Sequence, residues 1–434
     1  MEVAALAGLV LVVGIIALLA LGIPVSVAVG TSSAAAAITV LGFENGLLTS
    51  AQQMFRGVNN FSLLAIPFFV LAGVIMNNGG IALRLVNFAK VLVGRAPGSL
   101  AQTNVAANAM FGAVSGSAVA SVAAVGSTMG PLQAKEGYPK DFAAATNIAS
   151  APSGMIIPPS NLMIVYSLVS STSVAALFVA GYVPGVLWAA ACMVIVHLYS
   201  RKRPELRVTE KLSAPARWRV VGEAVPALLL IVVVIGGILA GIFTPTEASC
   251  IAVLYSGVLA FVYRNVKVRD LSGILLETVR TTSVVMFLVG VSAVMSWVMS
   301  FAQIPQLVTD GLLAVSTNPY VLLLLIILLL LVIGCFMDPT PAVLIFAPIF
   351  LPVVTAFGMD PIHFGIFMVM ALSIGTITPP VGPVLFVGAR VSGMSIESVM
   401  RRMLPFFAAL VALLVVVAMT PALSLWLPGL LGLS

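Results

Sequence analysis

The sequence predicts an all-α polytopic membrane protein made of two inverted repeats, each with a re-entrant helical hairpin and a proline-broken helix. Three observations predict this fold class: an apolar composition, prolines that recur at one fixed offset, and a pair of interrupted apolar segments. Of the 434 residues, 61% are hydrophobic and only 8% are charged, and the mean hydropathy is +1.19. Soluble domains carry about a quarter charged residues, so a soluble fold is excluded.

Prolines of the first half recur in the second half at a constant offset of 221 residues. At this proline frequency, chance would give roughly one coincident pair. The pairs are Pro24 and Pro245, Pro131 and Pro352, Pro158-Pro159 and Pro379-Pro380, and Pro184 and Pro405, joined by Gly137 and Gly358 and by Gly154 and Gly375. We therefore expect one repeat in residues 1–200, a basic linker in 201–222 and a second repeat in 223–434.

Apolar segments of about 20 residues predict the membrane-spanning helices of each repeat. The expected helices are about 3–20, 24–42, 61–78, 141–170 and 174–199 in the first repeat, and about 224–243, 246–263, 281–299, 361–389 and 403–428 in the second. Because an odd number of crossings separates the start of the chain from the linker, the repeats should have opposite orientations in the membrane. Inverted repeats of this kind are typical of secondary transporters.

The orientation follows from the positive charges. The linker 201–222 carries seven Lys or Arg residues and should be cytoplasmic, which places both chain termini outside. The same orientation puts 19 of the 20 Lys and Arg residues on the cytoplasmic side, and only Arg56 outside. Because the positive-inside rule accounts for the positions of these basic residues, the net charge of +6 does not indicate a nucleic acid partner, and none is expected.

Two segments are too long for one crossing and too short for two: residues 99–131 and 320–352. Each is predicted to be a re-entrant hairpin, the first entering from the cytoplasm with its tip near 115–117, the second entering from outside with its tip near 334–340. Before each hairpin lies an amphipathic stretch, at 81–93 and about 303–315, which suits either an interfacial helix or a connecting loop.

Opposite each hairpin, the sequence predicts a helix broken at a Pro-Pro pair, at 141–170 and 361–389. We expect each break to leave backbone carbonyls available, at residues 150–154 and 373–378. Carbonyl and hydroxyl oxygens at helix breaks suit Na⁺, a hard cation that prefers oxygen ligands. Small residues such as Ser and Gly also occur in membrane helices for another reason, since they allow helices to pack closely. Close packing is therefore the alternative to cation binding.

Two or more Na⁺ ions are therefore predicted as coupling ions. The first cation site is expected at Ser115, Ser117, Ser150, Ser153 and Gly154, and the second cation site at Gly334, Asp338, Gly375, Thr376 and Thr378. Because a carboxylate inside a membrane is costly, Asp338 is a functional candidate that could bind Na⁺, hold the hairpin tip or carry a proton. Glu247, which follows Pro245 at a helix start, is instead expected to cap that helix.

Exposed backbone amides at a helix break favour anions. The substrate carboxylate is therefore expected just after Pro159, at the start of the helix that follows. The candidate substrate-binding residues are Pro159, Ser160, Asn161, Ser117 and Asp338. The sequence contains no GxxxxGK[ST] phosphate-binding loop, no HExxH and no GxSxG motif. An enzyme is therefore not expected, and only Asp338 favours an intramembrane enzyme as the rival class.

At these motifs the sequence resembles the large membrane subunit of TRAP (tripartite ATP-independent periplasmic) transporters. The resemblance covers essentially the whole chain. It rests on SGSAVASVAAVGSTMGP from Ser115, SAPSGMIIPPSNLMIVY from Ser150, TPTEASCIAVLY from Thr244, MDPTPAVLIFAPIFLP from Met337 and GTITPPVGP from Gly375.

The resemblance implies a Na⁺-driven elevator mechanism, in which a transport domain of hairpins and broken helices slides against a scaffold domain. It implies two partners, a small four-helix membrane subunit and a periplasmic substrate-binding protein, and a location in the bacterial inner membrane with periplasmic termini. The substrates it implies are organic acids: dicarboxylates, 2-oxo acids, sugar acids or sialic acid. Similar sialic acid transporters are expected to carry an acid a few positions after the first tip, where this chain reads Ala-Val-Ala-Ser at 118–121.

A second class shares the inverted hairpin architecture: divalent-anion/Na⁺ symporters, which work without a binding protein. Those proteins usually carry Ser-Asn-Thr at both tips, and neither tip of this sequence does. The stand-alone symporter is therefore the alternative function.

Overall fold

The computed structural model describes residues 2–93, 96–201, 203, 206, 214–316 and 318–433, and no strand occurs among them. Part of the predicted linker 201–222, including residues 207–213, lies outside the described residues. The first half contains α1 (Glu2–Ala20), α2 (Val25–Leu41), α3 (Phe43–Val58), η1 (Phe61–Leu64), α4 (Ala65–Asn78), α5 (Ile81–Val93), α6 (Ser99–Ser115), α7 (Ala118–Lys135), α8 (Lys140–Ser150), α9 (Ser153–Ile156), α10 (Asn161–Ser170) and α11 (Val174–Arg201).

The second half is helical as well. It contains α12 (Ala214–Leu239), α13 (Pro245–Val262), η3 (Val268–Asp270), α14 (Leu271–Phe301), α15 (Ile304–Val315), α16 (Pro319–Phe336), α17 (Pro339–Ala356), α18 (Pro361–Gly375), α19 (Pro383–Ser392), α20 (Ile396–Met419) and α21 (Ala422–Leu430). Across the described part of the chain, nine helices or joined helix pairs are long and apolar enough to cross a membrane. The predicted all-α polytopic class is confirmed.

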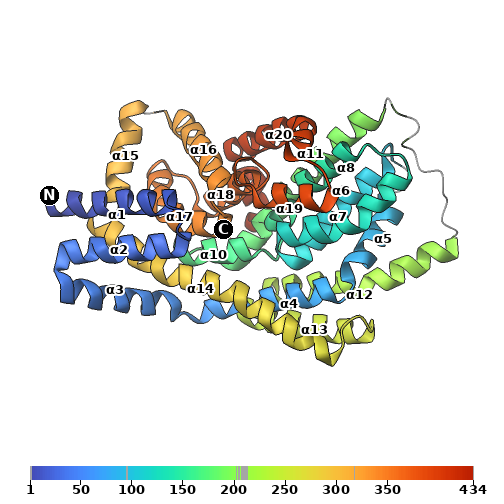
Figure 1. The fold of residues 1–434 in the computed structure, drawn as a ribbon, viewed down its shortest axis with the longest axis horizontal. Helices are drawn as coiled ribbons and strands as arrows, with labels where there is room; N and C mark the ends of the chain where they lie inside the picture. Colours follow the sequence, from blue (N-terminus) through green and yellow to red (C-terminus); the bar gives the residue numbers. More distant parts are fainter. Residues whose placement is uncertain are drawn as a thin grey trace.

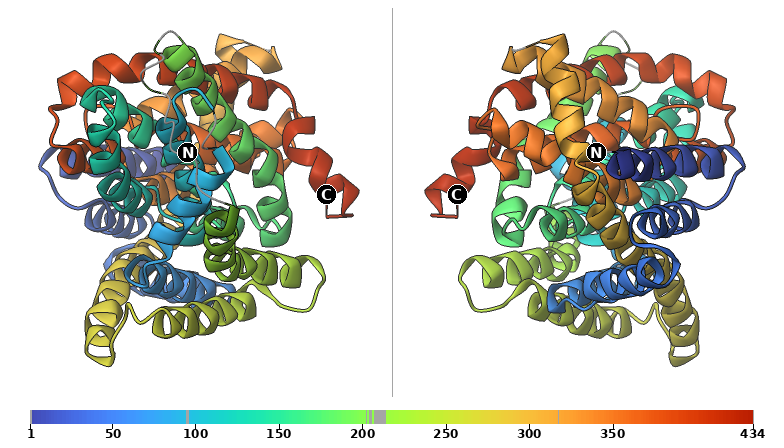
Figure 2. Two further views of the ribbon diagram at one scale, coloured as in Figure 1. Left: turned by 90° about the vertical axis from the view of Figure 1, so that its right-hand side faces the viewer. Right: turned by 90° about the vertical axis from the view of Figure 1, so that its left-hand side faces the viewer.

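The helices form two groups that lie against each other (Figures 1 and 2). Helices α2, α3, α4, α12, α13 and α14 pack on one another and lie along the lower side of Figure 1. The hairpin helices α6, α7, α16 and α17, with α8, α11 and α18–α20, form the other group. Contacts of α4 with α6 and α10, and of α14 with α17, join the two groups.

The hairpin helices correspond closely between the halves. Helices α7 and α17 have 18 residues each, and their first residues, Ala118 and Pro339, are 221 positions apart. The first turn lies at Gly116 and Ser117 and the second at Met337 and Asp338, within the stretches where the sequence predicts the tips. The opposite membrane orientations of the repeats stay a prediction.

The predicted broken helix 141–170 is α8, α9 and α10, and the axis bends by 44° at the break before Asn161. Its counterpart is α18 and α19, which are separated by residues 376–382. Both Pro-Pro peptides, Pro158-Pro159 and Pro379-Pro380, are cis.

The bounds of three predicted helices are wrong. The expected helix 224–243 is α12, which begins at Ala214, and the expected helix 281–299 is α14, which begins at Leu271. The last helix, expected at 403–428, ends at Met419 and is followed by the separate helix α21. Helix α3 was not predicted at all. Its polar residues lie on one face of an amphipathic helix, so a search for continuous apolar segments misses it.

The helix starting at Pro245 has the predicted cap. Glu247 accepts hydrogen bonds from the backbone N–H and the hydroxyl of Thr244, at 2.8 Å each, and its own N–H donates to the Thr244 hydroxyl. This reciprocal capping box satisfies the helix start. Glu247 therefore acts in helix capping, as expected.

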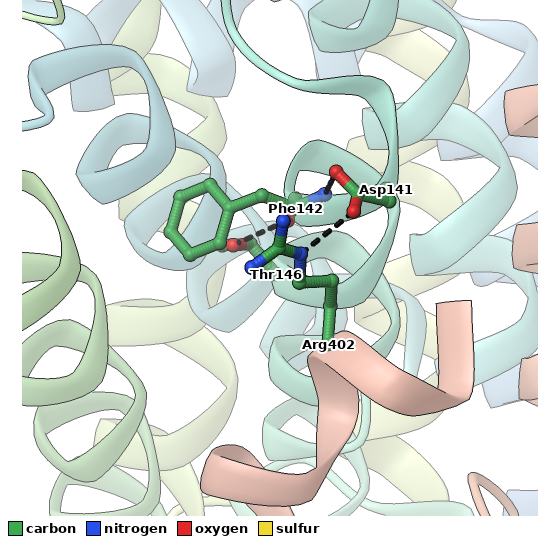
Figure 3. A network of polar contacts seen from close by, with 4 residues as sticks. All are labelled: Asp141, Phe142, Thr146 and Arg402. Atoms are coloured by element: carbon green, nitrogen blue, oxygen red, sulfur yellow. Dashed lines mark hydrogen bonds and ion pairs between the residues drawn. The ribbon is translucent and has the colours of Figure 1, made fainter. Parts of the chain in front are cut away.

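An ion pair joins the broken helix of the first half to a helix of the second. Arg402 on α20 donates from Nε to Asp141 Oδ2 at 2.6 Å, and Asp141 Oδ1 accepts the backbone N–H of Phe142 (Figure 3). The Phe142 ring stacks on Tyr199 of α11, with ring centroids 3.7 Å apart. This contact fixes the start of α8 against α11 and α20.

Replacing Arg402 with alanine should lower the stability of the folded chain. The pair is partly exposed, with side-chain exposures of 42% for Arg402 and 24% for Asp141, so solvent screens it. We expect a loss of about 0.5–1.5 kcal/mol, seen as a melting temperature a few degrees lower in detergent. A double-mutant cycle with Asp141→Ala isolates the pair, and strictly additive effects would show that it contributes nothing.

Candidate functional site

The first hairpin tip is a two-residue turn, Gly116 and Ser117, between α6 and α7, and Ser115 is the last residue of α6. Gly116 has φ +63°, a left-handed conformation that glycine adopts without strain. Ser117 then caps α7, because its hydroxyl accepts the N–H of Ala120 at 3.3 Å. Ser115 and Ser117 are joined by hydrogen bonds of 3.4 Å between the Ser115 hydroxyl and the Ser117 backbone. The tip therefore presents two hydroxyl groups within one turn.

The first tip packs on the broken helix at two points. Gly112 of α6 touches Gly154 of α9 so closely that a Cβ on either glycine would run into the backbone of the other. A Cβ on Gly116 would lie 3.3 Å from Asn161 Nδ2 and 3.5 Å from the carbonyl oxygen of Pro159. The structure thus brings predicted cation residues and predicted substrate residues of the first half together.

The second hairpin repeats this packing. Gly334 of α16 touches Gly375 at the end of α18, where a Cβ on Gly375 would overlap the Gly334 backbone. Gly112 and Gly334 therefore make equivalent contacts, although they are 222 residues apart, because five residues separate Gly112 from the start of α7 and four separate Gly334 from the start of α17. Asp338 caps α17, and its Oδ1 accepts the N–H of Thr340 at 3.2 Å.

The prediction that the breaks leave backbone carbonyls free is wrong for several of them, because these carbonyls accept hydrogen bonds. In the first break, the Ser150 carbonyl accepts the Ser153 hydroxyl at 2.7 Å, and the Ser153 carbonyl accepts the N–H of Ile157 at 2.9 Å. In the second, the Gly375 carbonyl accepts the N–H of Thr378 at 3.0 Å, and the Thr376 carbonyl accepts the N–H of Val384 at 3.1 Å. Each carbonyl keeps a second lone pair.

The hydroxyls near the two breaks are engaged to different degrees. Ser150 donates to the carbonyl of Thr146, Thr376 to that of Ser373 and Thr378 to that of Ile374, each at 2.7 Å. The hydroxyl of Ser373, which is fully buried, has no hydrogen-bond partner in the described part of the chain. An orphaned buried oxygen beside a glycine contact suits a cation at the second break.

A cavity of about 310 Å³ lies between the two hairpin tips. Ser115, Ser117, Asn161, Asp338 and Thr376 line it from the hairpins and broken helices. The remaining predicted site residues do not line the cavity: Ser150, Ser153, Gly154, Pro159, Ser160, Gly334, Gly375 and Thr378. Ser160 is buried and caps α10, since its hydroxyl accepts the N–H of Met163 at 3.4 Å.

The opposite wall of the cavity was missed from the sequence. Asn77 of α4 and Glu277 and Thr281 of α14 line it. Glu277 falls outside the helix predicted at 281–299, and α14 begins six residues before it. A start signal was available: Asp270, at the end of η3, accepts the N–H of Lys267 and marks a helical turn just before α14.

The cavity carries two carboxylates, Asp338 and Glu277, on opposite walls, and none of its lining residues in the described chain is Lys or Arg. Such a lining favours cations. An anion can bind beside these carboxylates only when cations or protons neutralise them, or where hydroxyl, amide and helix N-terminal groups face it. The arrangement therefore suits joint binding of cations and an organic anion better than binding of the anion alone.

The chain is similar to a known protein family and to several known proteins. The model of the family described as the tripartite ATP-independent periplasmic transporter, DctM component, matches residues 12–423. The chain is 52% identical over 418 residues to protein YgiK of Salmonella typhimurium, with 96% of each chain covered.

Two further relatives have names that state a substrate. The C4-dicarboxylate TRAP transporter large permease protein of Pseudomonas aeruginosa is 39% identical, with 92% of this chain and 93% of the relative covered. The sialic acid TRAP transporter large permease protein of Vibrio cholerae is 40% identical, with 91% and 93% covered. Among solved structures, the YdaH transporter of Alcanivorax borkumensis shares the fold, with a TM-score of 0.61, 17% identity and coverage of 87% and 88%.

Proposed function

Because the chain belongs to the family of the DctM component of tripartite ATP-independent periplasmic transporters, we propose that it imports an organic acid by Na⁺-driven secondary transport. The single observation that carries the proposal is the cavity between the two hairpin tips, which places hydroxyls, an amide and a carboxylate from both halves around one space. Substrate and coupling ions bind together there.

The substrate carboxylate binds at the start of α10, where Asn161 and the hydroxyls of Ser115 and Ser117 face the cavity. The helix start offers backbone N–H groups and a positive dipole end to an anion. C4-dicarboxylates and sialic acid, named for two relatives, both carry such a carboxylate, as do 2-oxo acids and sugar acids. Ser121 in place of an acid favours the smaller acids over sialic acid.

Na⁺ ions bind at the first and second cation sites, which share Ser115, Ser117, Asp338 and Thr376 with the lining of the cavity. Support comes from the hydroxyl and carbonyl oxygens of the two breaks, which lie next to the glycine contacts, and from the Ser373 hydroxyl, which has no partner in the described part of the chain. Neutral oxygens and one carboxylate form a donor set that suits Na⁺. Bound Na⁺ offsets the negative charge of Asp338 and so permits an anion to bind next to it.

Transport proceeds by an elevator movement. The group of helices that carries the hairpins moves against the group built on α2–α4 and α12–α14, and the cavity lies between them. The membrane is the bacterial inner membrane, with the linker cytoplasmic and the chain ends periplasmic, as the basic residues indicate. The partners are a small four-helix membrane subunit and a periplasmic substrate-binding protein, which complete the tripartite system.

The deciding experiment is uptake into proteoliposomes that contain this chain and its small subunit. Labelled C4-dicarboxylates, 2-oxo acids, sugar acids and sialic acid are supplied under an inward Na⁺ gradient, with and without the binding protein. Uptake that requires both Na⁺ and the binding protein supports the proposal and identifies the substrate. Uptake with Na⁺ alone would identify a stand-alone divalent-anion/Na⁺ symporter, which is the alternative function.

Glu277 should weaken the binding of the organic acid on the cytoplasmic side. It lies near the start of α14, which follows the basic residues Lys267 and Arg269, and its carboxylate faces the cavity. Repulsion between like charges at an exposed site is worth about 1 kcal/mol. We expect Glu277→Gln to lower the half-saturating concentration of the organic acid about fivefold in inside-out vesicles. Glu44→Gln, which lies outside the cavity, should leave that concentration unchanged. An unchanged value in the Glu277 variant would contradict this role.

A further inference from the structure

A buried polar network lies between the first hairpin and its broken helix. Asn108 of α6 is at its centre, fully buried, and its Nδ2 lies 2.9 Å from each of three oxygens: Asn104 Oδ1, Asn147 Oδ1 and Ser150 Oγ. Its Oδ1 accepts the hydroxyl of Ser121 on α7 at 2.9 Å. One amide therefore joins both arms of the hairpin to α8.

A second amide strengthens this connection. Asn147 of α8 donates from Nδ2 to the Val122 carbonyl of α7 at 2.8 Å, and its side-chain Oδ1 lies 2.9 Å from Asn108 Nδ2. Four side chains of the network, those of Asn104, Asn108, Ser121 and Asn147, are at most 2% exposed. Buried hydrogen bonds are directional, so they fix the depth of the hairpin and its rotation relative to α8.

The described residues of the second half form no such network at the equivalent positions. The equivalent positions, taken from the Gly112–Gly334 match for α16 and from the constant offset elsewhere, are Ile326 for Asn104, Leu330 for Asn108, Ala342 for Ser121, Met368 for Asn147 and Ala371 for Ser150. All five are buried and apolar. At these five positions the second half therefore packs through apolar contacts, so the surroundings of the two predicted cation sites differ.

The network ends at a residue of the first cation site. Ser150 accepts a hydrogen bond from Asn108 and donates its own to the Thr146 carbonyl, which fixes the direction of its remaining lone pair. The Ser150 carbonyl accepts the hydroxyl of Ser153, one residue before the Gly112–Gly154 contact. Any displacement of Ser150 would therefore be passed on to the turn 150–154.

We propose that Asn108 is a positioning residue for the first cation site: its amide holds Ser150 and the turn 150–154 in the geometry that binds Na⁺, and the second cation site has no equivalent. This inference rests on the proposed function, since it needs Na⁺ at the first break. Holding ligands in place before the ion arrives lowers the cost of binding.

The test measures Na⁺ binding without transport. The full chain, purified with its small subunit, is titrated with Na⁺ at constant ionic strength, and the Na⁺ concentration that gives half of the thermal stabilisation is recorded. Because one neutral hydrogen bond is worth about 0.5–1.5 kcal/mol, Asn108→Leu should raise this concentration about 3- to 10-fold. The KM for the organic acid at saturating Na⁺ should change less than about twofold, because Asn108 does not line the cavity.

A second variant separates binding from folding. Asn108→Leu alone leaves buried partners unpaired and could prevent folding, whereas combining it with Asn104→Ile, Ser121→Ala and Asn147→Met copies the apolar packing of the second half. Ser150 stays in place. This variant with four substitutions should fold, and it should need the same raised Na⁺ concentration for half of its thermal stabilisation. Arg402→Ala is the control, since it should lower the melting temperature and leave the Na⁺ requirement unchanged.

The outcomes are distinct. If the variant with four substitutions needs the same Na⁺ concentration as the wild-type protein for half of its thermal stabilisation, the positioning role is overturned and the proposed function is left intact. A wild-type protein that Na⁺ stabilises no better than choline would overturn Na⁺ coupling itself, and this inference with it.

Discussion

Replacing Gly154 with alanine should reduce Na⁺-driven uptake on the order of 100-fold, the effect expected when a site is displaced by about 1 Å. The added methyl group would overlap the backbone of Gly112, and a backbone cannot move aside as a flexible side chain can. Overpacking of this kind typically costs about 1–3 kcal/mol. The hairpin would therefore shift away from the break, which separates Ser115 and Ser117 from Ser150 and Ser153.

A glycine in the hairpin that Gly154 contacts provides the matched control. Gly130 lies in α7, and a Cβ there would meet nothing within 4 Å. Gly130→Ala should keep wild-type uptake and add slight helix stability. Uptake is measured in proteoliposomes at equal protein content, with correct insertion checked by protease accessibility. Equal, wild-type uptake in both variants would mean that the Gly112–Gly154 contact has no part in transport.

Much of the fold could be predicted because backbone rules mark it in the sequence. Pro-Pro pairs cannot continue a helix, so the two breaks were visible, and glycine with small polar residues marked both tips. The predictions failed where a helix is amphipathic or continues into a charged segment. Helix α3 and the first turns of α12 and α14 are of this kind, and tertiary packing rather than hydropathy stabilises them.

The site was predictable only where it is local. Ser115, Ser117, Asn161, Asp338 and Thr376 belong to tips or breaks, and the structure brings them to one cavity. Glu277 and Asn77 come from helices that no motif links to the tips. The Asn108 network was equally hidden, because its partners lie up to 42 residues away and only folding brings them together.

The carboxylate of Asp338 should be essential for uptake, and two substitutions separate its charge from its capping role. Asparagine caps a helix about as well as aspartate, so Asp338→Asn keeps the hydrogen bond to the N–H of Thr340 and removes only the charge. An interaction with a charged group is worth about 1.5–3 kcal/mol, which corresponds to roughly a 10- to 150-fold loss of uptake at low Na⁺. Asp338→Ala should lose the cap as well and melt earlier.

The comparison of these two variants decides what Asp338 does. If the charge binds Na⁺, both variants lose uptake and both require more Na⁺ for thermal stabilisation, while only the alanine variant loses stability without Na⁺. If Asp338 served only to hold the second tip, the asparagine variant would transport at the wild-type rate with unchanged Na⁺ dependence. A carboxylate in a cavity without a basic residue among its described lining needs a cation beside it before an organic anion can enter, which is why we expect the first result.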